Sequence, residues 1–206
     1  MPSRSVTLDV DGETYDGRVN EPDEPTESAV LVLPGMGHGP FGDVFDRFAT
    51  AAAGEGHRVA RFETWTGRDD VAEKTDSEHG REIQAGAEFL RDRDCETVTI
   101  VAKSFGGRLA LTHLPRASAD RFVLWAPAIL FGEHENRPSV TAAELAELDL
   151  PARILQGDED EVVSVENARS IAEHLPNGEL VELPGEDHSF RTDEDRIVDE
   201  TLSFLP

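Results

Sequence analysis

The 206-residue chain contains one cysteine, one tyrosine and two lysines. A single cysteine, Cys95, excludes an internal disulfide and a cysteine-rich metal site, and its place just before an apolar segment predicts a buried small residue. No apolar run approaches the roughly 18 residues that a membrane span needs. The first residues also lack the basic segment followed by an apolar one that marks a secretory signal. We therefore expect a soluble, cytoplasmic protein.

Positive charge is also scarce. The sequence has 19 lysines and arginines against 43 acidic residues, a formal net charge of −24, and only Lys74 and Lys103 are lysines. This balance argues against nucleic acid or an anionic membrane as a partner, because phosphate binding needs a basic face. The acids are spread along the whole chain and do not form one interaction tail. Such a surface favours a halophilic protein, since screening over about 3 Å at 1 M salt suppresses self-repulsion.

The apolar residues form repeated clusters, which predict one α/β domain over residues 1–206. The first 20 residues alternate around Asp11-Gly12 and predict a β-hairpin, followed by an acidic, proline-rich connector at 20–27. Strands are predicted at 29–33, 58–62, 97–102, 122–126, 152–156 and 180–183. Helices are predicted at 43–53, 79–91, 106–114, 139–148, 165–175 and 193–204. This alternation favours a mostly parallel sheet with helices on both faces. The stretch with room for a lid, 129–138, is short.

The strongest predicted strand is followed at once by AKSFGG, residues 102–107, which opens the next helix. This is the place of a nucleophile elbow, a tight strand-to-helix turn that projects a serine above the sheet. Small residues are needed two positions before and after the serine because the two backbones nearly touch there. Ala102 and Gly106 meet that need around Ser104. Taken alone, the string is short, and Ser104 also suits a helix N-cap.

The order of residues along the chain strengthens the case. Ligands bind at the carboxyl ends of parallel strands, and Asp160 and His188 each follow a later predicted strand. The order Ser104, Asp160, His188 is the one that an α/β sheet with a nucleophile elbow requires. In such a site His188 takes the serine proton, while Asp160 fixes the imidazole tautomer. Asp158 competes for the acid role, and Asp160 is preferred because the loop needs a few residues to turn back over the sheet edge.

A serine nucleophile also needs two backbone N–H groups aimed at the developing oxyanion. One is expected from Phe105, the residue after the nucleophile. The other is expected from Met36 in the loop LPGMGHG, residues 33–39, where glycines allow close backbone approach. The alternative for this loop is a plain strand-to-helix connection.

The same loop offers a rival interpretation. Residues 37–42 spell G-x-G-x-x-G, and Glu63 follows about 20 residues later, as in a dinucleotide site. However, the first glycine comes four residues after Leu33, outside the tight turn, and Pro40 interrupts the fingerprint. A dinucleotide-binding protein would also leave the serine, aspartate and histidine placements without a purpose.

Metal and cofactor sites are not indicated. The other histidines show no ligand spacing, and Glu133-His134-Glu135 fits chance neighbours in a chain this acidic. We expect catalysis, if present, to need no cofactor and no metal ion.

At this point four segments, LPGMGHG, VAKSFGGRLAL, LQGDEDEVV and GEDHSF, resemble motifs of compact α/β-hydrolases with little or no lid, in the size range of dienelactone hydrolases. The K-S-x-G-G-R elbow is similar to a subgroup whose eukaryotic members include a chromatin-complex subunit. Over about residues 29–205 the resemblance implies the α/β-hydrolase fold, and the N-terminal β-hairpin suits it. It implies Ser104 as nucleophile, Asp160 as acid, His188 as base, and Met36 and Phe105 as oxyanion donors. Dienelactone hydrolases use cysteine at the nucleophile position and glycine in place of alanine before it, so their substrate does not transfer.

Two functions from different classes follow. The first is a serine hydrolase that cleaves an ester or thioester of a small or accessible acyl substrate through an acyl-Ser104 intermediate. Phe41, Trp65, Phe105 and Phe131 are its candidate apolar walls, although each also suits ordinary packing. The second is a non-catalytic interaction scaffold, because some members of the K-S-x-G-G-R subgroup serve that way. The motifs define a reaction class and leave the acyl group and the oligomeric state open.

Overall fold

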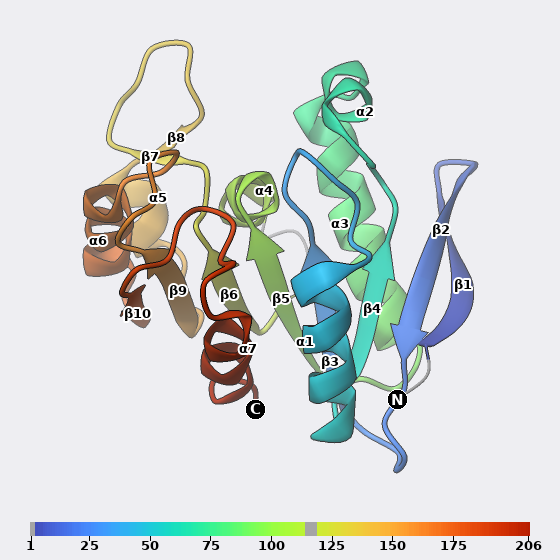
Figure 1. Ribbon diagram of the computed structural model, residues 1–206. Coiled ribbons are helices and arrows are strands. Elements are labelled where there is room, and N and C mark those ends of the chain that lie inside the picture. The colour runs from blue at the N-terminus through green and yellow to red at the C-terminus, as the bar shows by residue number, and fades with distance from the viewer. Residues whose placement is uncertain (1–2, 114–118) are drawn as a thin grey trace.

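The computed structural model describes residues 3–113 and 119–206, and its centre is an eight-stranded sheet (Figure 1). The strand order is β1-β2-β4-β3-β5-β6-β9-β10. The strands are β1 (Ser3–Val10), β2 (Glu13–Asn20), β3 (Ser28–Leu33), β4 (Arg58–Phe62), β5 (Thr97–Lys103), β6 (Arg121–Trp125), β9 (Ala152–Gly157) and β10 (Gly178–Leu183). The β1–β2 hairpin joins the sheet antiparallel, and every other neighbouring pair is parallel. The predicted hairpin and mostly parallel sheet are confirmed.

Helices cover both faces of the sheet, as Figure 1 shows. On one face lie α1 (Asp43–Gly54) and α7 (Glu194–Leu202); on the other lie α3 (Asp76–Arg91), α4 (Phe105–His113) and α6 (Val165–His174). The central strands β3, β5 and β6 are mostly apolar because successive side chains point to opposite faces and both faces are buried there, whereas β1, β2 and β10 at the edges carry many exposed polar residues. In β3, Val30 and Val32 pack toward α1, whereas Leu31 and Leu33 pack toward α3 and α4.

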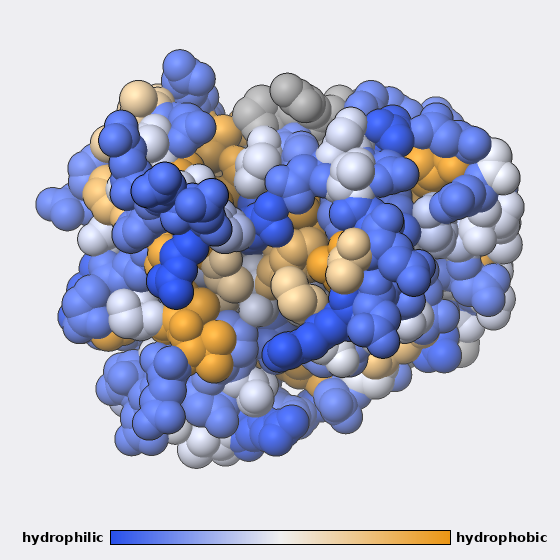
Figure 2. Space-filling view, turned by 90° about the horizontal axis from the view of Figure 1, so that it is seen from above, coloured by the Kyte–Doolittle hydropathy of each residue, from blue (hydrophilic) through white to orange (hydrophobic). Residues whose placement is uncertain are grey.

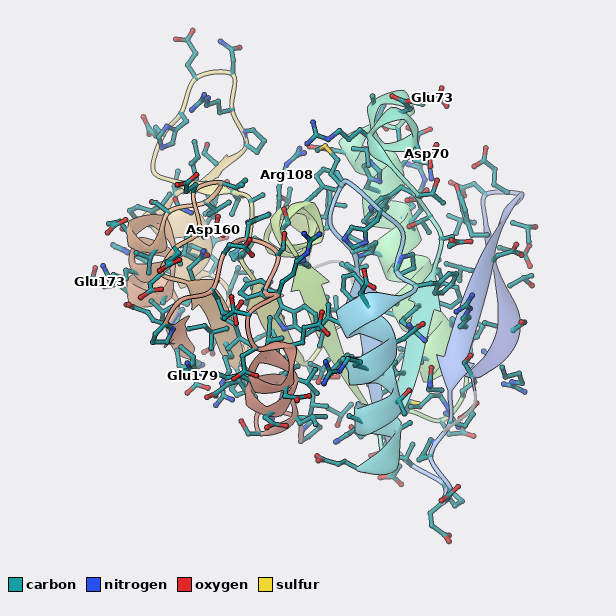
Figure 3. All side chains as sticks on the ribbon, viewed as in Figure 1. Asp70, Glu73, Arg108, Asp160, Glu173 and Glu179 are labelled. Atoms are coloured by element: carbon teal, nitrogen blue, oxygen red, sulfur yellow. The ribbon has the colours of Figure 1, made fainter. Side chains whose placement is uncertain are left out.

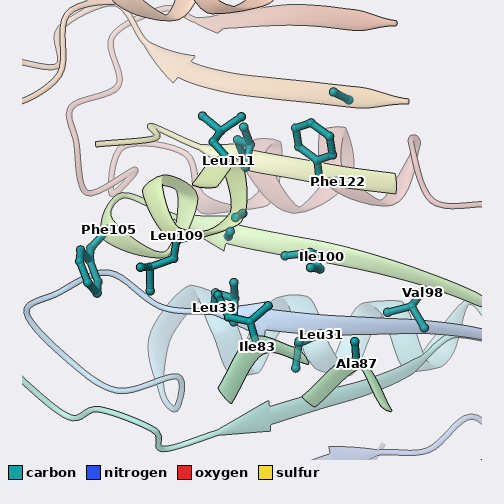
Figure 4. Packing of buried hydrophobic residues seen from close by; sticks show 14 of the residues in the cluster. Leu31, Leu33, Ile83, Ala87, Val98, Ile100, Phe105, Leu109, Leu111 and Phe122 are labelled. Atoms are coloured by element: carbon teal, nitrogen blue, oxygen red, sulfur yellow. The ribbon is translucent and has the colours of Figure 1, made fainter. Parts of the chain in front are cut away.

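The larger of the two cores lies between the sheet and α3, α4 and α6. Figure 4 shows Leu31 and Leu33 of β3 facing Ile83 and Ala87 of α3, with Leu109 of α4 beside them. Each of these side chains is at most 5% exposed. Burying one such Leu or Ile side chain stabilises the fold by about 1.5–3 kcal/mol. The start of α4 is therefore fixed against β3, and this contact shapes the site.

Two local features differ from the sequence prediction. The helix expected at 139–148 is shorter: Ser139–Val140 pairs as β8 with β7 (Leu130–Phe131), and α5 covers Ala142–Ala146. The reason is a capping box in which Thr141 and the Glu144 side chain bond each other's backbone N–H groups, so the helix starts after Thr141.

An extra helix, α2 (Arg68–Glu73), was not predicted, because none of its residues is buried and it leaves no apolar periodicity. Leu114, the predicted last residue of the helix at 106–114, lies outside the described residues. Across 3–113 and 119–206, no helix combines the length and the apolar character needed to cross a membrane.

Candidate active site

Ser104 stands on a sharp turn between β5 and α4. Its φ of +50° lies in the left-handed region that L-residues rarely adopt. The turn is tight because α4 presses against the end of β3: a Cβ atom added to Gly106 would lie 2.7 Å from the carbonyl oxygens of both Leu33 and Pro34. Ala102, which replaces the more usual glycine, is fully buried within the sheet. The structure therefore gives Ser104 the backbone of a nucleophile elbow.

Ser104, His188 and Asp160, the three residues predicted to act together, are connected by hydrogen bonds. The His188 Nε2 atom is 2.8 Å from Ser104 Oγ, and its Nδ1 atom is 2.8 Å from Asp160 Oδ2. A carboxylate only accepts hydrogen bonds, so Nδ1 carries the proton and Nε2 is left to accept from the serine hydroxyl. Figure 3 shows Asp160 in the loop after β9, at the same end of the sheet as Arg108 in the first turn of α4. This geometry can move a proton from Ser104 to His188.

The Asp160 carboxylate is kept ionised. Burial acts to raise its pKa, but hydrogen bonds from His188 and from the backbone N–H groups of Val162 and Val163 outweigh burial, so the pKa is lower than usual. The two backbone bonds, at 2.8 and 2.9 Å, both end on Oδ1. The charge is thus available to stabilise an imidazolium at His188.

One polar neighbour of Asp160 was missed by the sequence analysis. Gln156, the fully buried residue at the end of the predicted strand, donates from Nε2 to Asp160 Oδ2 at 2.8 Å and to the Val163 carbonyl at 3.0 Å. Its signal in the sequence is a lone amide in an otherwise apolar strand, four residues before the acid. Gln156 orients the carboxylate that in turn orients His188.

The acid loop and the histidine loop are joined by their backbones. A Cβ atom on Gly157 would lie 2.1 Å from the Glu186 carbonyl oxygen, which also accepts from Glu159 N at 3.1 Å. Asp158, the competitor for the acid role, accepts instead from Gly185 N at 2.7 Å. These contacts hold the two loops together, and they leave Asp160 as the carboxylate that bonds His188.

Lys103, which precedes Ser104, also reaches the histidine loop. It is 8% exposed, and its Nζ atom donates to the Ser189 carbonyl at 3.4 Å. Burial lowers the pKa of its ammonium group. The contact ties the strand that ends in the elbow to the loop that carries His188.

The two predicted oxyanion donors belong to segments next to Ser104. Phe105 begins α4, and Met36 follows Gly35, where an added Cβ atom would lie 3.5 Å from Ser104 Cβ. Within the part of the chain that the structure describes, neither Met36 N nor Phe105 N has a protein hydrogen-bond partner. Both amides are therefore free to bind a ligand oxygen.

The candidate substrate walls are all engaged in packing. The Arg18 guanidinium lies 4.1 Å from the centre of the Phe41 ring, and the Phe131 ring lies 4.5 Å from that of His174. Trp65 is only 1% exposed and Phe105 only 3%. The Trp65 ring belongs to the interior rather than to an open substrate surface, because its indole turns inward toward the loop before Met36.

The face that carries the strand ends is mostly hydrophilic. Figure 2 looks down on it and shows small apolar groups near its centre between hydrophilic side chains. Val162, next to the acid loop, is the one large hydrophobic residue of the described chain that is exposed, at 71%. The site thus lies on an open face with limited apolar area.

The residues of the dinucleotide and metal alternatives can also be located in the structure. In the dinucleotide pattern, a Cβ on Gly37 or Gly42 would meet nothing within 4 Å, although the φ of +87° at Gly42 favours glycine; a Cβ on Gly39 would lie 3.3 Å from Glu63 Oε1. His134 contacts the Phe131 carbonyl through Nε2 at 2.9 Å. Among residues 3–113 and 119–206, no three His, Cys, Asp or Glu side chains gather closely enough to hold a metal ion.

Comparisons with known proteins agree with this fold. Est1E from Butyrivibrio proteoclasticus has a TM-score of 0.81 at 15% identity, over 97% of this chain and 96% of that one. XC6422 from Xanthomonas campestris, described as an α/β serine hydrolase without a lid, has a TM-score of 0.73 at 21% identity, over 100% and 97% of the two chains. A dienelactone hydrolase from Anabaena variabilis has a TM-score of 0.80 at 16% identity, over 98% and 96%.

At these identities the likeness to solved structures concerns the fold alone. No curated protein matches the chain. A family model described as "Alpha/beta hydrolase domain" matches residues 26–202. The chain therefore belongs to the alpha/beta hydrolase family.

Proposed function

We propose that the protein is a serine hydrolase that cleaves an ester or thioester of a small or accessible acyl group, with Ser104, His188 and Asp160 as its catalytic triad. The observation that carries the proposal is the continuous chain of two 2.8 Å hydrogen bonds from Ser104 through His188 to Asp160. An interaction scaffold has no need of this arrangement on a strained turn.

In the first half of the reaction, Ser104 Oγ forms a bond to the acyl carbon while His188 Nε2 takes the hydroxyl proton. The carbonyl oxygen becomes an oxyanion, which the N–H groups of Met36 and Phe105 stabilise. The bond to the leaving group then breaks, and His188 returns its proton to the leaving alcohol or thiol. The product of this half is the acyl-Ser104 ester.

In the second half, water attacks the acyl-enzyme. His188 removes a proton from the water molecule as its oxygen bonds to the acyl carbon, and the same two amides stabilise the second oxyanion. The bond to Ser104 breaks, and Oγ recovers its proton from His188. The net reaction consumes one water and releases a carboxylic acid with the alcohol or thiol.

The surroundings of the triad support small or well-exposed acyl groups. The segment between β6 and α5, where a lid would lie, holds only the two-residue strands β7 and β8. Est1E, one of the similar structures, is recorded with bound ferulic acid, and others are described as esterases. These descriptions support an ester substrate here as part of the proposal, with Phe41 and Phe131 kept as candidates for apolar contact.

Active-site labelling tests the proposal. We expect a fluorophosphonate to modify the wild-type protein at one serine in molar KCl, and Ser104→Ala to remove the label. Ser170→Ala is the matched control, because Ser170 lies on α6 and its hydroxyl bonds the Glu166 carbonyl. Failure to label the wild type, or equal labelling of Ser104→Ala, overturns the assignment. A stoichiometric protein partner of an unlabelled chain points to the scaffold instead.

The substrate class is tested by a chain-length series. We expect p-nitrophenyl and thioester substrates with short acyl chains to give the highest kcat/KM, because the described face offers little apolar area. A steady rise of kcat/KM toward long acyl chains contradicts this part of the proposal.

A further inference from the structure

Trp65 follows β4 and is buried beneath the loop that precedes Met36. Buried indole N–H groups nearly always find a hydrogen-bond partner, and here the partner is the Gly35 carbonyl oxygen, 3.0 Å from Nε1. That carbonyl belongs to the same peptide unit as the Met36 N–H group. The Trp65 indole is therefore hydrogen-bonded to the peptide group whose N–H is a proposed oxyanion donor.

A trans peptide unit is planar, and its C=O and N–H bonds point in opposite directions. A donor that holds the oxygen of Gly35 thus fixes the direction in which Met36 N–H points. Gly35, which supplies the carbonyl of this peptide, also lies close to the nucleophile, since its Cβ position is 3.5 Å from Ser104 Cβ. We infer that Trp65 is a positioning residue for the oxyanion hole, setting the orientation of the Met36 amide without touching the substrate; the inference rests on the proposed hydrolase function.

The same indole supports the second donor. The rings of Trp65 and Phe105 pack edge to face, with centroids 5.6 Å apart and an interplanar angle of 82°. His79 of α3 completes the cluster, at 5.5 Å from Trp65 and 5.4 Å from Phe105, both again edge to face. Such pairs contribute beyond their buried area because ring edges and faces carry opposite partial charge. Phe105, whose N–H is the second donor, is thus held by its ring.

The cluster is anchored on its far side by charged groups. His79 Nδ1 lies 3.3 Å from Glu82 Oε2, and the other Glu82 oxygen bonds the Lys74 ammonium group. Glu82 is 4% exposed and His79 is 1% exposed. Trp65 consequently packs against a fixed wall, and its N–H has little freedom to leave the Gly35 carbonyl. Both oxyanion amides then keep their orientation before substrate arrives.

The expected effect of losing the indole N–H is on the chemical step. Removing an oxyanion donor outright lowers kcat by about 10²–10³-fold, so misorienting one of two donors through Trp65→Phe is expected to lower kcat by about tenfold. The KM is expected to stay within about twofold, because the amides act mainly on charge that develops in the transition state. If a substitution only reduces the share of correctly folded protein, the apparent kcat falls in proportion to that share. Active-site titration counts the active molecules and so corrects for this effect.

Trp125 offers a matched control. It is the only other tryptophan, it is equally buried at 0% exposure, and its Nε1 atom donates to Thr201 Oγ1 at 2.9 Å on the opposite side of the sheet. Trp125→Phe therefore removes the same ring area and one buried hydrogen bond on the face away from Trp65, and it keeps the backbone carbonyl of residue 125 that accepts from Ser104 N at 2.8 Å.

The experiment measures kcat, KM and the inhibition constant of phenylboronic acid, whose tetrahedral adduct on a serine mimics the oxyanion state. We expect Trp65→Phe to lower kcat and weaken phenylboronic acid by similar factors, and Trp125→Phe to leave both within about twofold per titrated site. Equal values for the two variants, or a loss confined to KM, overturn the inference. An unlabelled, inactive wild type overturns the proposed hydrolase function instead.

A second measurement needs no change at Trp65. In the Trp125→Phe protein, Trp65 supplies the only indole N–H signal in a nitrogen–proton NMR spectrum. We expect that signal to shift when phenylboronic acid forms its adduct, because the bound oxyanion polarises the peptide that the indole holds. An unmoved Trp65 signal at saturation with phenylboronic acid refutes the positioning role.

Discussion

Replacing Asp160 by asparagine tests the hydrogen bonding of the proposed triad. The carboxylate accepts four hydrogen bonds: Oδ1 from Val162 N and Val163 N, and Oδ2 from His188 and Gln156. An asparagine must place an NH2 group at one of these two oxygens, where it faces donors. The backbone N–H groups at Oδ1 cannot turn away, whereas the imidazole at Oδ2 can change its tautomer. The NH2 group is therefore expected at the Oδ2 position.

In that arrangement His188 Nδ1 becomes an acceptor and the ring proton moves to Nε2. The nitrogen that faces Ser104 Oγ at 2.8 Å can then no longer accept the serine proton. We expect kcat to fall by about 10⁴-fold, as for the same wrong tautomer in other triads, which corresponds to about 5 kcal/mol in the activation free energy. The buried Gln156 amide loses one acceptor, which costs about 1–3 kcal/mol of folding stability.

The assay is p-nitrophenyl acetate hydrolysis, with folding checked by circular dichroism for each variant. Asp158→Asn is the matched control, since Asp158 lies two residues away and its carboxylate accepts from the loop amide of Gly185 and not from His188. We expect that variant to keep kcat within about twofold, because the amide oxygen of asparagine still accepts that bond. The reasoning is refuted if Asp160→Asn keeps more than a tenth of the wild-type kcat, or if Asp158→Asn is as slow.

Three further predictions concern the fold. Gly106→Ala should lower the free energy of unfolding by about 1–3 kcal/mol in urea melts, because the new methyl group meets two carbonyl oxygens, whereas Gly37→Ala should change it by less than about 1 kcal/mol. Since the pKa of Asp160 is lowered on folding, its charge stabilises the fold above the unfolded pKa of about 3.9, and this stabilisation is lost as pH falls through the folded value. The difference in unfolding free energy between wild type and Asp160→Asn should therefore shrink from neutral pH to about pH 3, and an unchanged difference contradicts the shift. If the net charge of −24 reflects adaptation to salt, the melting temperature should rise from dilute buffer to molar KCl, and a fall would count against that idea.

The centre of the sheet was predictable because β3, β5 and β6 are buried on both faces and stand out as apolar runs, while the hairpin was predictable from its alternation around Asp11-Gly12. Elements without buried side chains gave no such pattern: α2, Arg68–Glu73, has no buried residue. The two-residue strand Ser139–Val140 is too short to show a period, and it was absorbed into the predicted helix that follows. Only the capping box of Thr141, itself visible as T-x-x-E, marks the true start of that helix.

The candidate site was predictable where chain order carries the information. Ser104, Asp160 and His188 each follow a strand, and parallel strands bring their carboxyl ends to one edge. Gln156 and the role of Trp65 were not predictable in this way, because both depend on the direction of a side chain. The sequence places Trp65 after β4, but only packing shows that its ring turns inward, toward the Gly35 carbonyl.

The side chains of both lysines of the chain have little exposure to solvent. The side chain of Lys74 is 17% exposed and its ammonium group bonds Glu82, while Lys103 is 8% exposed beneath the Ser189 carbonyl. Activated esters and thioesters acylate accessible amines without any enzyme, and the side-chain amines of this chain are not openly presented. For the hydrolase function proposed above, this arrangement limits slow acylation of the protein by its own substrate. For the same reason, coupling to a solid support through lysine will be inefficient, whereas carboxylate-directed coupling has many targets.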